Sequence, residues 1–590
     1  MVPVRDWWRS LERAPEPLSA RQWGAVMAAT AVAAISRLFA LARTPWDWDE
    51  LLFMLSLDHF NVSLHHPHPP GFPLYVLAAK GIGKLGFTNF HSLQALSLLG
   101  AIGVVPAMFF LCRQLRMRFS TSLSAALLLA FFPNAWLYGG GAWSDVPSLT
   151  LVVAASAFLL AGCRDARAYF AGALILAVSA GFRPQNLLVG CAPLLIASAF
   201  QWRRSAARVA GAFALIAVIV TISYATAAAV TGWPEYVEAS REHRAYIMRV
   251  DSFLSPSRPP LWRVFDDFFV APYHAPAINI ILAALVLISI VRLRPHVVIA
   301  LASFGPLALV SWLVLDHYSA SRFSIGYAPL IALLAADGLQ KVARRPAIEA
   351  LASTIVIALM IEWTWPALSV VRSTDAPPVA AVEWIRSRHA DPLAGAIYVS
   401  ADMIPFAQWY LRDYRLHFLD KLQPPPSWPA GYYLFEGATK QGPSFARTHG
   451  RLWELVRHRY FAVSVRPTAS VVEFGSGWSP EERSPAEIWR WMGRRSETIL
   501  PPLEGPARLT LSFYIPRDAI PAPNVVIRLN GAIVDAFRGQ ATNVDRKIMV
   551  QSRAPNVLQI ETDQAVQPRV GDERALGLRL NSIEWAIVRP

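Results

Sequence analysis

Long apolar stretches recur through the first 366 residues of this 590-residue chain, and they constrain its fold more than any other feature. About 20 apolar residues are enough for a helix to cross the hydrocarbon core of a bilayer. Hydrophobic residues make up 54% of the chain, more than is usual for a soluble protein of this length. We expect about eleven transmembrane helices, near residues 23–41, 92–111, 120–138, 146–162, 169–181, 185–200, 209–230, 276–291, 297–315, 324–340 and 347–365.

The basic residues alternate between loops. They gather before the first span and after the second, fourth, sixth, eighth and tenth spans. By the positive-inside rule these segments face the cytoplasm. The acidic turn at 47–50, the turn at Asp145, the loop 231–275, the loop 316–322 and the region after 366 then face outward. We therefore expect a multi-pass protein of the bacterial inner membrane, with a cytoplasmic N-terminus and a periplasmic C-terminal region.

The ends of the chain differ in character from its apolar part. Residues 1–22 are basic and contain tryptophan, which predicts an amphipathic helix on the cytoplasmic face and no cleavable signal peptide. Helix-like and strand-like pieces alternate over 367–496, which predicts a soluble α/β domain. Short strands with turn signals over 497–590, including the hairpin signal Asn530-Gly531, predict a β-sandwich. The fold class is thus a polytopic α-helical membrane domain over 23–366, followed by these two domains.

Two segments near the first span point to chemistry. Trp46-Asp47-Trp48-Asp49-Glu50 directly follows that span, where acidic residues are costly to hold. A His/Pro-rich stretch, residues 65–75, comes fifteen residues later and predicts a loop folded against the membrane face. Together they indicate a catalytic carboxylate at the bilayer surface.

Four motifs carry a resemblance to a known family. Asp49-Glu50 follows the first span, and His68 to Tyr75 reads His-Pro-Pro-Gly-x-Pro-Leu-Tyr. Ser144-Asp145-Val146-Pro147 opens the fourth span, and Arg322-Phe323 opens a late one, with Pro329 further on. Residues 20–345 thereby resemble the GT-C glycosyltransferases, in particular the protein O-mannosyltransferases and related bacterial sugar transferases of the ArnT type.

The resemblance implies an integral membrane glycosyltransferase, hexosyl or pentosyl. It would move a sugar from a polyprenyl-phosphate-linked donor, such as an undecaprenyl-phosphate sugar, to a glycan, lipid or protein acceptor at the outer face. The C-terminal sandwich resembles non-catalytic carbohydrate-binding modules. Membrane lipids are the other expected partner, and the distribution of the +14 net charge argues against nucleic acid.

Such a transfer needs a carboxylate beside the acceptor hydroxyl and cations for the departing phosphate. The resemblance places Asp49 at the catalytic position, with Glu50 orienting hydroxyls and Asp47 as a credible substitute for Asp49. The alternative without a catalytic role is that Asp47, Asp49 and Glu50 are solvated residues at the end of a helix. Asp145 is expected to hold a donor hydroxyl or to assist a metal, or simply to cap the fourth span.

Several cationic and aromatic side chains are candidates for binding the donor. Arg322, with Tyr318 shortly before it, lies at the outer end of a span, where a guanidinium can hold a phosphate bidentately. The alternatives are a snorkelling anchor or an ion pair with Asp316. Arg183 lies between two short spans that are broken by a proline, and interrupted helices often line cavities. Arg37, inside the end of the first span, is a third candidate.

The histidines of the His/Pro-rich loop could have either a functional or a structural role. His65 and His68 are candidates for phosphate binding or proton transfer, although interfacial histidines are often structural. No spacing in the chain is diagnostic of a metal site, so we expect no metal or other cofactor, while a divalent ion remains compatible with the resemblance. The three cysteines lie in or beside spans and form no zinc motif or disulfide framework.

Other functions compete with the transferase. A lipid-carrier ligase would share its architecture. A transporter or flippase of polyprenyl-linked sugars should show two related halves, and the sequence shows none. A non-catalytic, carbohydrate-binding membrane scaffold would tolerate the loss of Asp49.

Overall fold

The computed structural model describes residues 8, 10–256, 258–273, 276–291, 293–388, 396–419, 431–436, 445–447, 463–467, 472–480, 482–483, 488–500, 506–551, 556–567 and 574–587. The chain divides into two compact units. The first holds Met1–Pro45 and Asp49–Asp375. The second holds Trp46–Trp48, Ala376–Gly450 and Arg459–Pro590. Within the α/β region, the sequence predicts strands over 395–400 and 460–465, and both of these segments begin outside the described residues.

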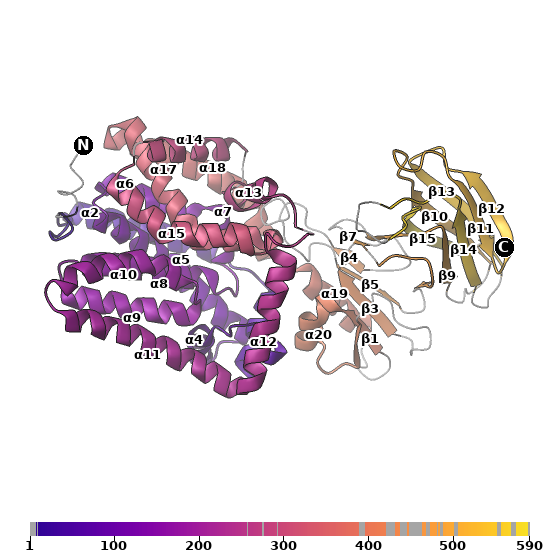
Figure 1. Cartoon of the computed structure of the whole chain (residues 1–590), viewed down its shortest axis with the longest axis horizontal. Helices are drawn as coiled ribbons and strands as arrows, with labels where there is room; N and C mark the ends of the chain where they lie inside the picture. Colours follow the sequence, from indigo (N-terminus) through magenta and orange to yellow (C-terminus); the bar gives the residue numbers. More distant parts are fainter. Residues whose placement is uncertain are drawn as a thin grey trace. The chain divides into compact units, whose positions relative to one another are not determined.

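The first unit is helical (Figure 1). Its helices are α2 (Ala20–Leu38), α3 (Trp48–Asp58), α4 (Pro73–Gly83), α5 (Asn89–Gln114), α6 (Phe119–Phe131), α7 (Pro133–Tyr138), α8 (Asp145–Ala161), α9 (Ala166–Phe182), α10 (Asn186–Trp202), α11 (Ala206–Thr231), α12 (Trp233–Tyr246), α13 (Leu261–Phe269), α14 (Pro276–Val291), α15 (Pro295–Val314), α16 (Ala320–Phe323), α17 (Ala328–Ala343) and α18 (Pro346–Ser373). Three single turns, η1 (Val62–Leu64), η4 (His317–Ser319) and η5 (Ser324–Tyr327), connect some of them.

Each of the eleven predicted apolar segments coincides with a helix, or with two in the case of α6 and α7. Among the described residues, five helical stretches are long and apolar enough to cross a membrane, and a bent pair makes a sixth if it is one broken span. The stretches are Asn89–Gln114, Ala206–Thr231, Pro295–Val314, His317–Ala343 and Pro346–Arg388. The chain is therefore a multi-pass membrane protein, and the count of about eleven spans stays a prediction.

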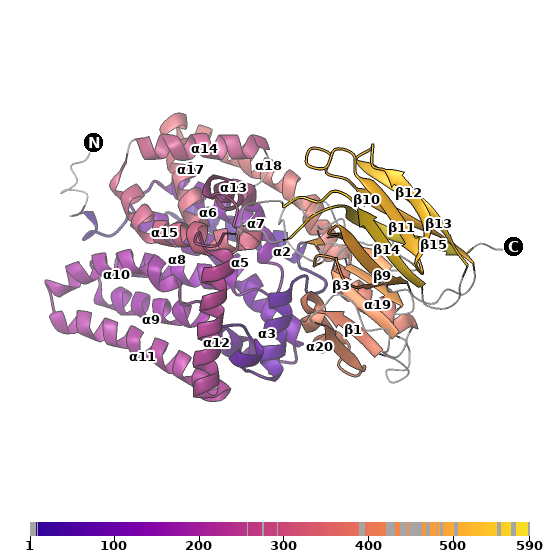
Figure 2. The same ribbon diagram turned by 45° about the vertical axis from the view of Figure 1, so that its right-hand side comes forward.

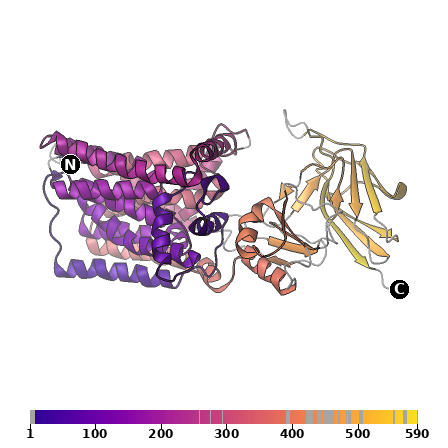
Figure 3. The ribbon, with the colours of Figure 1, turned by 90° about the horizontal axis from the view of Figure 1, so that it is seen from below.

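The long helices of the helical unit lie side by side (Figure 3). Helices α5 and α8 meet at Gly100, where an added Cβ would lie 2.5 Å from the backbone of Pro147. Within a bilayer small residues are the usual means of such close approach, because they let two backbones touch. The contact keeps the first turn of α8, and with it Asp145, against α5.

The external loop expected over 231–275 forms two helices, α12 and α13. In Figures 1 and 2, α12 runs across the direction of α9, α10 and α11. Its Tyr236 hydroxyl donates a 3.0 Å hydrogen bond to the Pro70 carbonyl of the His/Pro-rich loop. In the short helix α13, Val264 and Phe268 are buried while Trp262 is 76% exposed, which is the pattern of a helix lying at an interface.

The second unit contains an α/β part and a β part (Figure 2). The α/β part has the helices α19 (Pro377–Arg388) and α20 (Ile404–Tyr410), with a sheet of strand order β2-β1-β3-β5-β4. The strands are β1 (Ala396–Ser400), β2 (Leu416–Leu419), β3 (Gly431–Glu436), β4 (Phe445–Arg447) and β5 (Val463–Pro467). Strand β1 runs parallel to both β2 and β3.

The C-terminal part forms two sheets, ordered β13-β10-β15-β8-β7 and β12-β11-β14-β9-β6. Their strands are β6 (Glu473–Phe474), β7 (Glu482–Arg483), β8 (Ile488–Trp491), β9 (Arg495–Leu500), β10 (Ala507–Tyr514), β11 (Asn524–Leu529), β12 (Ala532–Arg538), β13 (Asn543–Val550), β14 (Asn556–Thr562) and β15 (Arg579–Ile587). Strands therefore join these sheets before residue 497, the expected start of the sandwich.

Every second residue along these strands is buried, and these residues form the core between the sheets. Leu509, Leu511 and Phe513 of β10 are buried with Ile527 of β11 and Ile560 of β14 in one hydrophobic cluster. The hairpin between β11 and β12 turns at the expected Asn-Gly pair, whose two residues both have positive φ. An Asn-Gly pair tolerates that conformation, which the tight hairpin turn requires.

Candidate active site

The site begins at the first turn of α3. The sequence predicts an acidic turn here, and in the structure Asp49 and Glu50 instead open an 11-residue helix. Consecutive helical residues project about 100° apart, so the two carboxylates point to different neighbours. A helix N-terminus also stabilises both negative charges.

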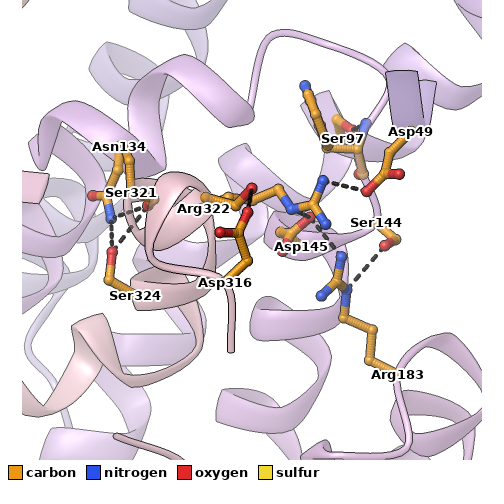
Figure 4. A network of polar contacts seen from close by, with 12 residues as sticks. Asp49, Ser97, Asn134, Ser144, Asp145, Arg183, Asp316, Ser321, Arg322 and Ser324 are labelled. Carbon is orange, nitrogen blue, oxygen red and sulfur yellow. Dashed lines mark hydrogen bonds and ion pairs between the residues drawn. The ribbon is translucent and has the colours of Figure 1, made fainter. Parts of the chain in front are cut away.

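Asp49 pairs with an arginine that is 273 residues away. Its Oδ2 accepts a hydrogen bond of 2.5 Å from Nη1 of Arg322 (Figure 4). Its Oδ1 lies 3.6 Å from Nδ1 of His68. The Asp49 side chain is 19% exposed, so another molecule can still reach it. Burial by itself raises the pKa of Asp49, but the charge and the hydrogen bond of Arg322, together with His68 and Arg183, hold that pKa well below its usual range. Asp49 is therefore ionised at neutral pH.

Arg322 is held by short contacts on several sides. It lies in α16, and its side chain is only 6% exposed. Its guanidinium carbon lies 4.9 Å from the ring centres of both Trp143 and Phe323. Asn134 of α7 donates hydrogen bonds to the Ser321 carbonyl (3.1 Å) and to the Ser324 hydroxyl (2.9 Å), which fixes the backbone on both sides of Arg322.

A second ion pair stands beside the first. Arg183 donates through Nη2 to Oδ2 of Asp145 at 2.7 Å and through Nε to the Ser144 hydroxyl at 2.9 Å. Both charged side chains are buried, 7% exposed for Arg183 and 4% for Asp145. Nε of Arg322 lies 3.9 Å from the same Oδ2 of Asp145, so this carboxylate faces two guanidiniums (Figure 4).

The local structure explains why these residues meet. Arg183 lies where α9 ends, since Pro184 follows it and α10 starts only at Asn186. The break turns the side chain toward the first turn of α8. Ser144 stands at the N-cap position of α8 without a capping hydrogen bond from its side chain, and Asp145, expected as the cap, is the first residue of the helix.

The His/Pro-rich loop closes one side of the site. Asn61 accepts hydrogen bonds from the backbone of Ser63 and Leu64, which starts the loop. Gly71 has φ +102°, a conformation that residues with side chains rarely adopt, and an added Cβ would lie 2.9 Å from Val62. This shape presents His68 to Asp49.

His68 is sheltered by aromatic rings. Its ring lies 4.9 Å from that of Phe72 and 6.0 Å from that of Phe53, measured between centres. The ring of His243, on α12, is 6.0 Å away. Burial lowers the pKa of His68 to about 4, although Asp49 acts in the opposite direction. His68 is therefore neutral at pH 7.

Glu50 points away from this pair. It is 1% exposed, and its Oε1 accepts the backbone N–H of Ala142 at 2.7 Å. Gly141, the preceding residue, leaves room for that carboxylate, because an added Cβ would lie 2.7 Å from Oε1. The predicted role of Glu50 in orienting hydroxyls is untested. Its observed contact fixes the turn that carries Trp143 and Asp145.

Two residues of α5 hold the same turn from the other side. Nε2 of Gln94 donates to the Gly140 and Ala42 carbonyls, both at 2.8 Å. The Ser97 hydroxyl donates to the Trp143 carbonyl at 2.7 Å and accepts its N–H at 3.1 Å. Sequence reasoning missed these anchors and Trp143 itself. The run Gly139-Gly140-Gly141 directly before them is the signal that could have drawn attention to the turn.

Two predicted site residues lie outside this cluster. His65, at the end of η1, is exposed, and burial lowers its pKa while Asp49 and Glu242 raise it. Tyr318, in η4, is 56% exposed, and its ring lies 4.1 Å from that of His317. Asp316 is the alternative ion-pair partner predicted for Arg322. It accepts hydrogen bonds within its own turn, from the Tyr318 N–H at 2.9 Å and from the Ser319 hydroxyl at 3.0 Å.

Arg37 also lies outside the cluster. Arg37 is 1% exposed and donates to the Ala130 carbonyl at the end of α6, with the ring of Phe131 5.2 Å from its guanidinium carbon. Its observed contacts thus join α2 to α6. Asp47 belongs to the second compact unit, and it stays an alternative to Asp49 for experiment to decide.

A small cavity of about 30 Å³ borders the Asp145–Arg183 pair. Polar groups line one end and apolar side chains the rest. Its lining residues are Asp145, Ser148, Leu149, Arg183, Gln185, Asn186, Leu307, Ser311, Leu315, Phe323 and Gly326.

Within the described part of the chain, no three His, Cys, Asp or Glu side chains come together as a metal site would require. The charges that the site offers to an anion are the two guanidiniums of Arg183 and Arg322. Arginine is well suited to this, because its fork of N–H groups matches the oxygens of a phosphate.

No family model matches the chain, and no curated protein does. Among solved structures, the chain is similar to ArnT from Cupriavidus metallidurans in the apo state, with TM-score 0.47 and 12% identity, over 76% of this chain and 98% of that one. The same protein bound to undecaprenyl phosphate gives a TM-score of 0.44 at the same identity and coverage. ArnT is one of the sugar transferases that the sequence resemblance names.

A second similar structure is the mycobacterial arabinofuranosyltransferase AftD, in its R1389S mutant form. It has a TM-score of 0.42 and 11% identity, over 98% of this chain and 62% of that one. The arabinosyltransferase EmbB from Mycobacterium smegmatis has a TM-score of 0.37 and 12% identity, over 98% and 67%. We base the proposed function on the site's own geometry rather than on these similarities.

Proposed function

We propose that this chain is an integral membrane glycosyltransferase that moves a sugar from a polyprenyl-phosphate-linked donor to an acceptor at the outer face of the membrane. The observation that carries the proposal is the paired cluster at the ends of the apolar helices. Asp49 is ionised and reachable, and Arg322 and Arg183 converge on the adjacent Asp145. A base and a phosphate clamp are the two parts that this reaction requires.

The chemistry follows from that arrangement. The acceptor oxygen attacks the anomeric carbon, and the bond between that carbon and the phosphate oxygen breaks. Asp49 takes the hydroxyl proton, while the polyprenyl phosphate leaves with the bonding electrons. Its phosphate gains negative charge as the bond breaks, and buried guanidiniums stabilise that charge more strongly than water would.

The neighbouring residues have supporting roles in this proposal. Asp145 keeps both guanidiniums oriented, and His68, which is neutral, flanks Asp49 and leaves its charge in place. The apolar side chains of Leu307, Leu315 and Phe323, which line the adjacent cavity, would border the first isoprenoid units of the donor. A donor that enters from the bilayer needs no nucleotide-binding motif.

The placement in the cell is part of the proposal. The alternation of basic loops supports a cytoplasmic N-terminus and a site on the periplasmic face of a bacterial inner membrane. The C-terminal unit would then lie on the same side, available to a glycan, lipid or protein acceptor. Whether the sugar is a hexose or a pentose is left to the donor panel below.

The test is sugar transfer from a panel of radiolabelled undecaprenyl-phosphate sugars by the purified full-length protein. Asp49→Asn should abolish transfer and leave the protein folded. The matched control is Asp58→Asn, at the exposed far end of the same helix, where the carboxylate accepts only an ordinary 2.8 Å hydrogen bond from Asn89. This control should transfer sugar at the wild-type rate.

Other results would redirect the proposal. Unchanged transfer by Asp49→Asn would move the base to Asp47 or Asp145. No transfer with any donor, together with movement of labelled lipid across liposomes, would identify a transporter. Binding without either activity would identify a scaffold.

A further inference from the structure

One guanidinium serves two anions in the proposed mechanism. Arg322 is the proposed ligand of the donor phosphate, and its Nη1 is bound to Asp49 at 2.5 Å. Two aromatic rings enclose it, those of Trp143 and Phe323. The rings restrict the guanidinium to few orientations, so that a phosphate and Asp49 compete for the same N–H groups.

The competition matters because Asp49 must accept a proton. A carboxylate paired with arginine has a low proton affinity, and a general base works best when its pKa lies near the working pH. Burial raises the pKa of Asp49, but Arg322, with smaller contributions from His68 and Arg183, lowers it by more than burial raises it. As long as the pair persists, Asp49 is a weak base.

We propose that the donor phosphate takes Arg322 from Asp49, so that donor binding itself switches the base on. This inference rests on the proposed function and adds a regulation of the same site. Two effects act in the same direction. Asp49 loses its cationic partner, and a new negative charge arrives nearby, which favours the protonated carboxyl.

Neighbouring side chains can stabilise Arg322 both when it is bound to Asp49 and when it is bound to the donor phosphate. Asp145 lies 3.9 Å from its Nε, so the guanidinium keeps an anionic neighbour when it leaves Asp49. The charged and titratable groups that act on Asp49 include Arg322, His68, Arg183, Asp145, His65 and His243. His68, 3.6 Å from Oδ1, is in position to donate a hydrogen bond to the released carboxylate.

A kinetic order follows. Donor must bind before the acceptor hydroxyl can be deprotonated, so an acceptor that arrives first meets an inactive base.

The test measures binding alone, with undecaprenyl phosphate as the probe and the full-length protein in lipid nanodiscs. Asp49→Asn removes the charge that competes for Arg322. The wild type must break the Asp49–Arg322 hydrogen bond when the probe binds, whereas the variant has no such charged bond to break. We therefore expect Asp49→Asn to bind the probe about tenfold more tightly. Arg322→Ala should bind it much more weakly. Asp58→Asn, which removes an equal charge from the far end of α3, should bind like the wild type.

The outcomes separate the two proposals. If the probe binds the wild type and needs Arg322, but Asp49→Asn binds it equally or more weakly, the switch is refuted and the transferase stands. If the probe does not bind, or binds Arg322→Ala as well as the wild type, the proposed phosphate site itself is wrong. Asp49→Ser replaces Asp49→Asn if the latter fails to fold, with the same expectation.

Discussion

Substitutions of Glu50 can distinguish a residue that acts on the substrate from one that only positions its neighbours. Its carboxylate is buried, and its Oε1 accepts the Ala142 N–H at 2.7 Å. Glu50→Ala would leave that N–H buried without an acceptor. Glu50→Gln keeps a carbonyl oxygen in the same place and removes only the charge.

The size of the effect follows from that contact. A buried donor left without a partner costs about 1–3 kcal/mol. Glu50→Ala should therefore lower the stability of the helical unit by roughly that amount and loosen the turn that carries Trp143 and Asp145. Misplaced phosphate ligands then reduce transfer on the order of a hundredfold. Glu50→Gln should cost less than about 1 kcal/mol and keep most of the activity.

The assays are thermal unfolding of the purified protein and initial rates of sugar transfer at varied donor concentration. For a positioning role, Glu50→Ala raises the KM for donor and lowers kcat, whereas Glu50→Gln changes both little. If Glu50→Gln loses transfer as fully as Glu50→Ala while unfolding at the wild-type temperature, then the negative charge acts on substrate and our reasoning is wrong.

Three further predictions concern the same site. Gly141→Ala places a Cβ 2.7 Å from Oε1 of Glu50 and 2.8 Å from Nε1 of Trp143, so it should destabilise the protein by about 1–3 kcal/mol, which thermal unfolding measures. Trp143→Ala removes a ring that lies 4.9 Å from the Arg322 guanidinium carbon and should weaken undecaprenyl phosphate binding several-fold, whereas Trp143→Phe keeps part of that binding. Burial lowers the pKa of His68 from 6.5 to about 4, so between these values the unfolded chain binds a proton that the folded one does not. Stability should therefore fall as pH drops through this window by roughly 1 kcal/mol per pH unit, and His68→Phe should lose this contribution to the pH dependence in parallel unfolding curves.

Much of the helical architecture could be predicted from the sequence. Each apolar segment, such as 92–111 or 209–230, coincides with a helix, because the length of an apolar run is a local property that the bilayer imposes on the chain. The Asn530-Gly531 hairpin was predictable for a similar reason, since the turn depends on the conformations those two residues tolerate. The α3 helix was missed because its short acidic start resembles a turn.

The candidate residues were also chosen from sequence, but their partners were not. Nothing local indicates that Asp49 faces Arg322, or that Asp145 faces Arg183 across the break between α9 and α10. Tyr318 follows the same pattern of polar residues at a membrane surface, yet it is largely exposed.

The sequence by itself determined that this chain crosses a membrane many times and carries acidic and basic residues at the ends of its apolar segments. Only the tertiary structure decided which of them form the site. The direction of a side chain depends on the rotation of its helix, and that rotation is set by packing against distant segments. A turn of about 100° per residue sends Asp49 to Arg322 and Glu50 to the Ala142 backbone, although the two carboxylates are neighbours in the chain.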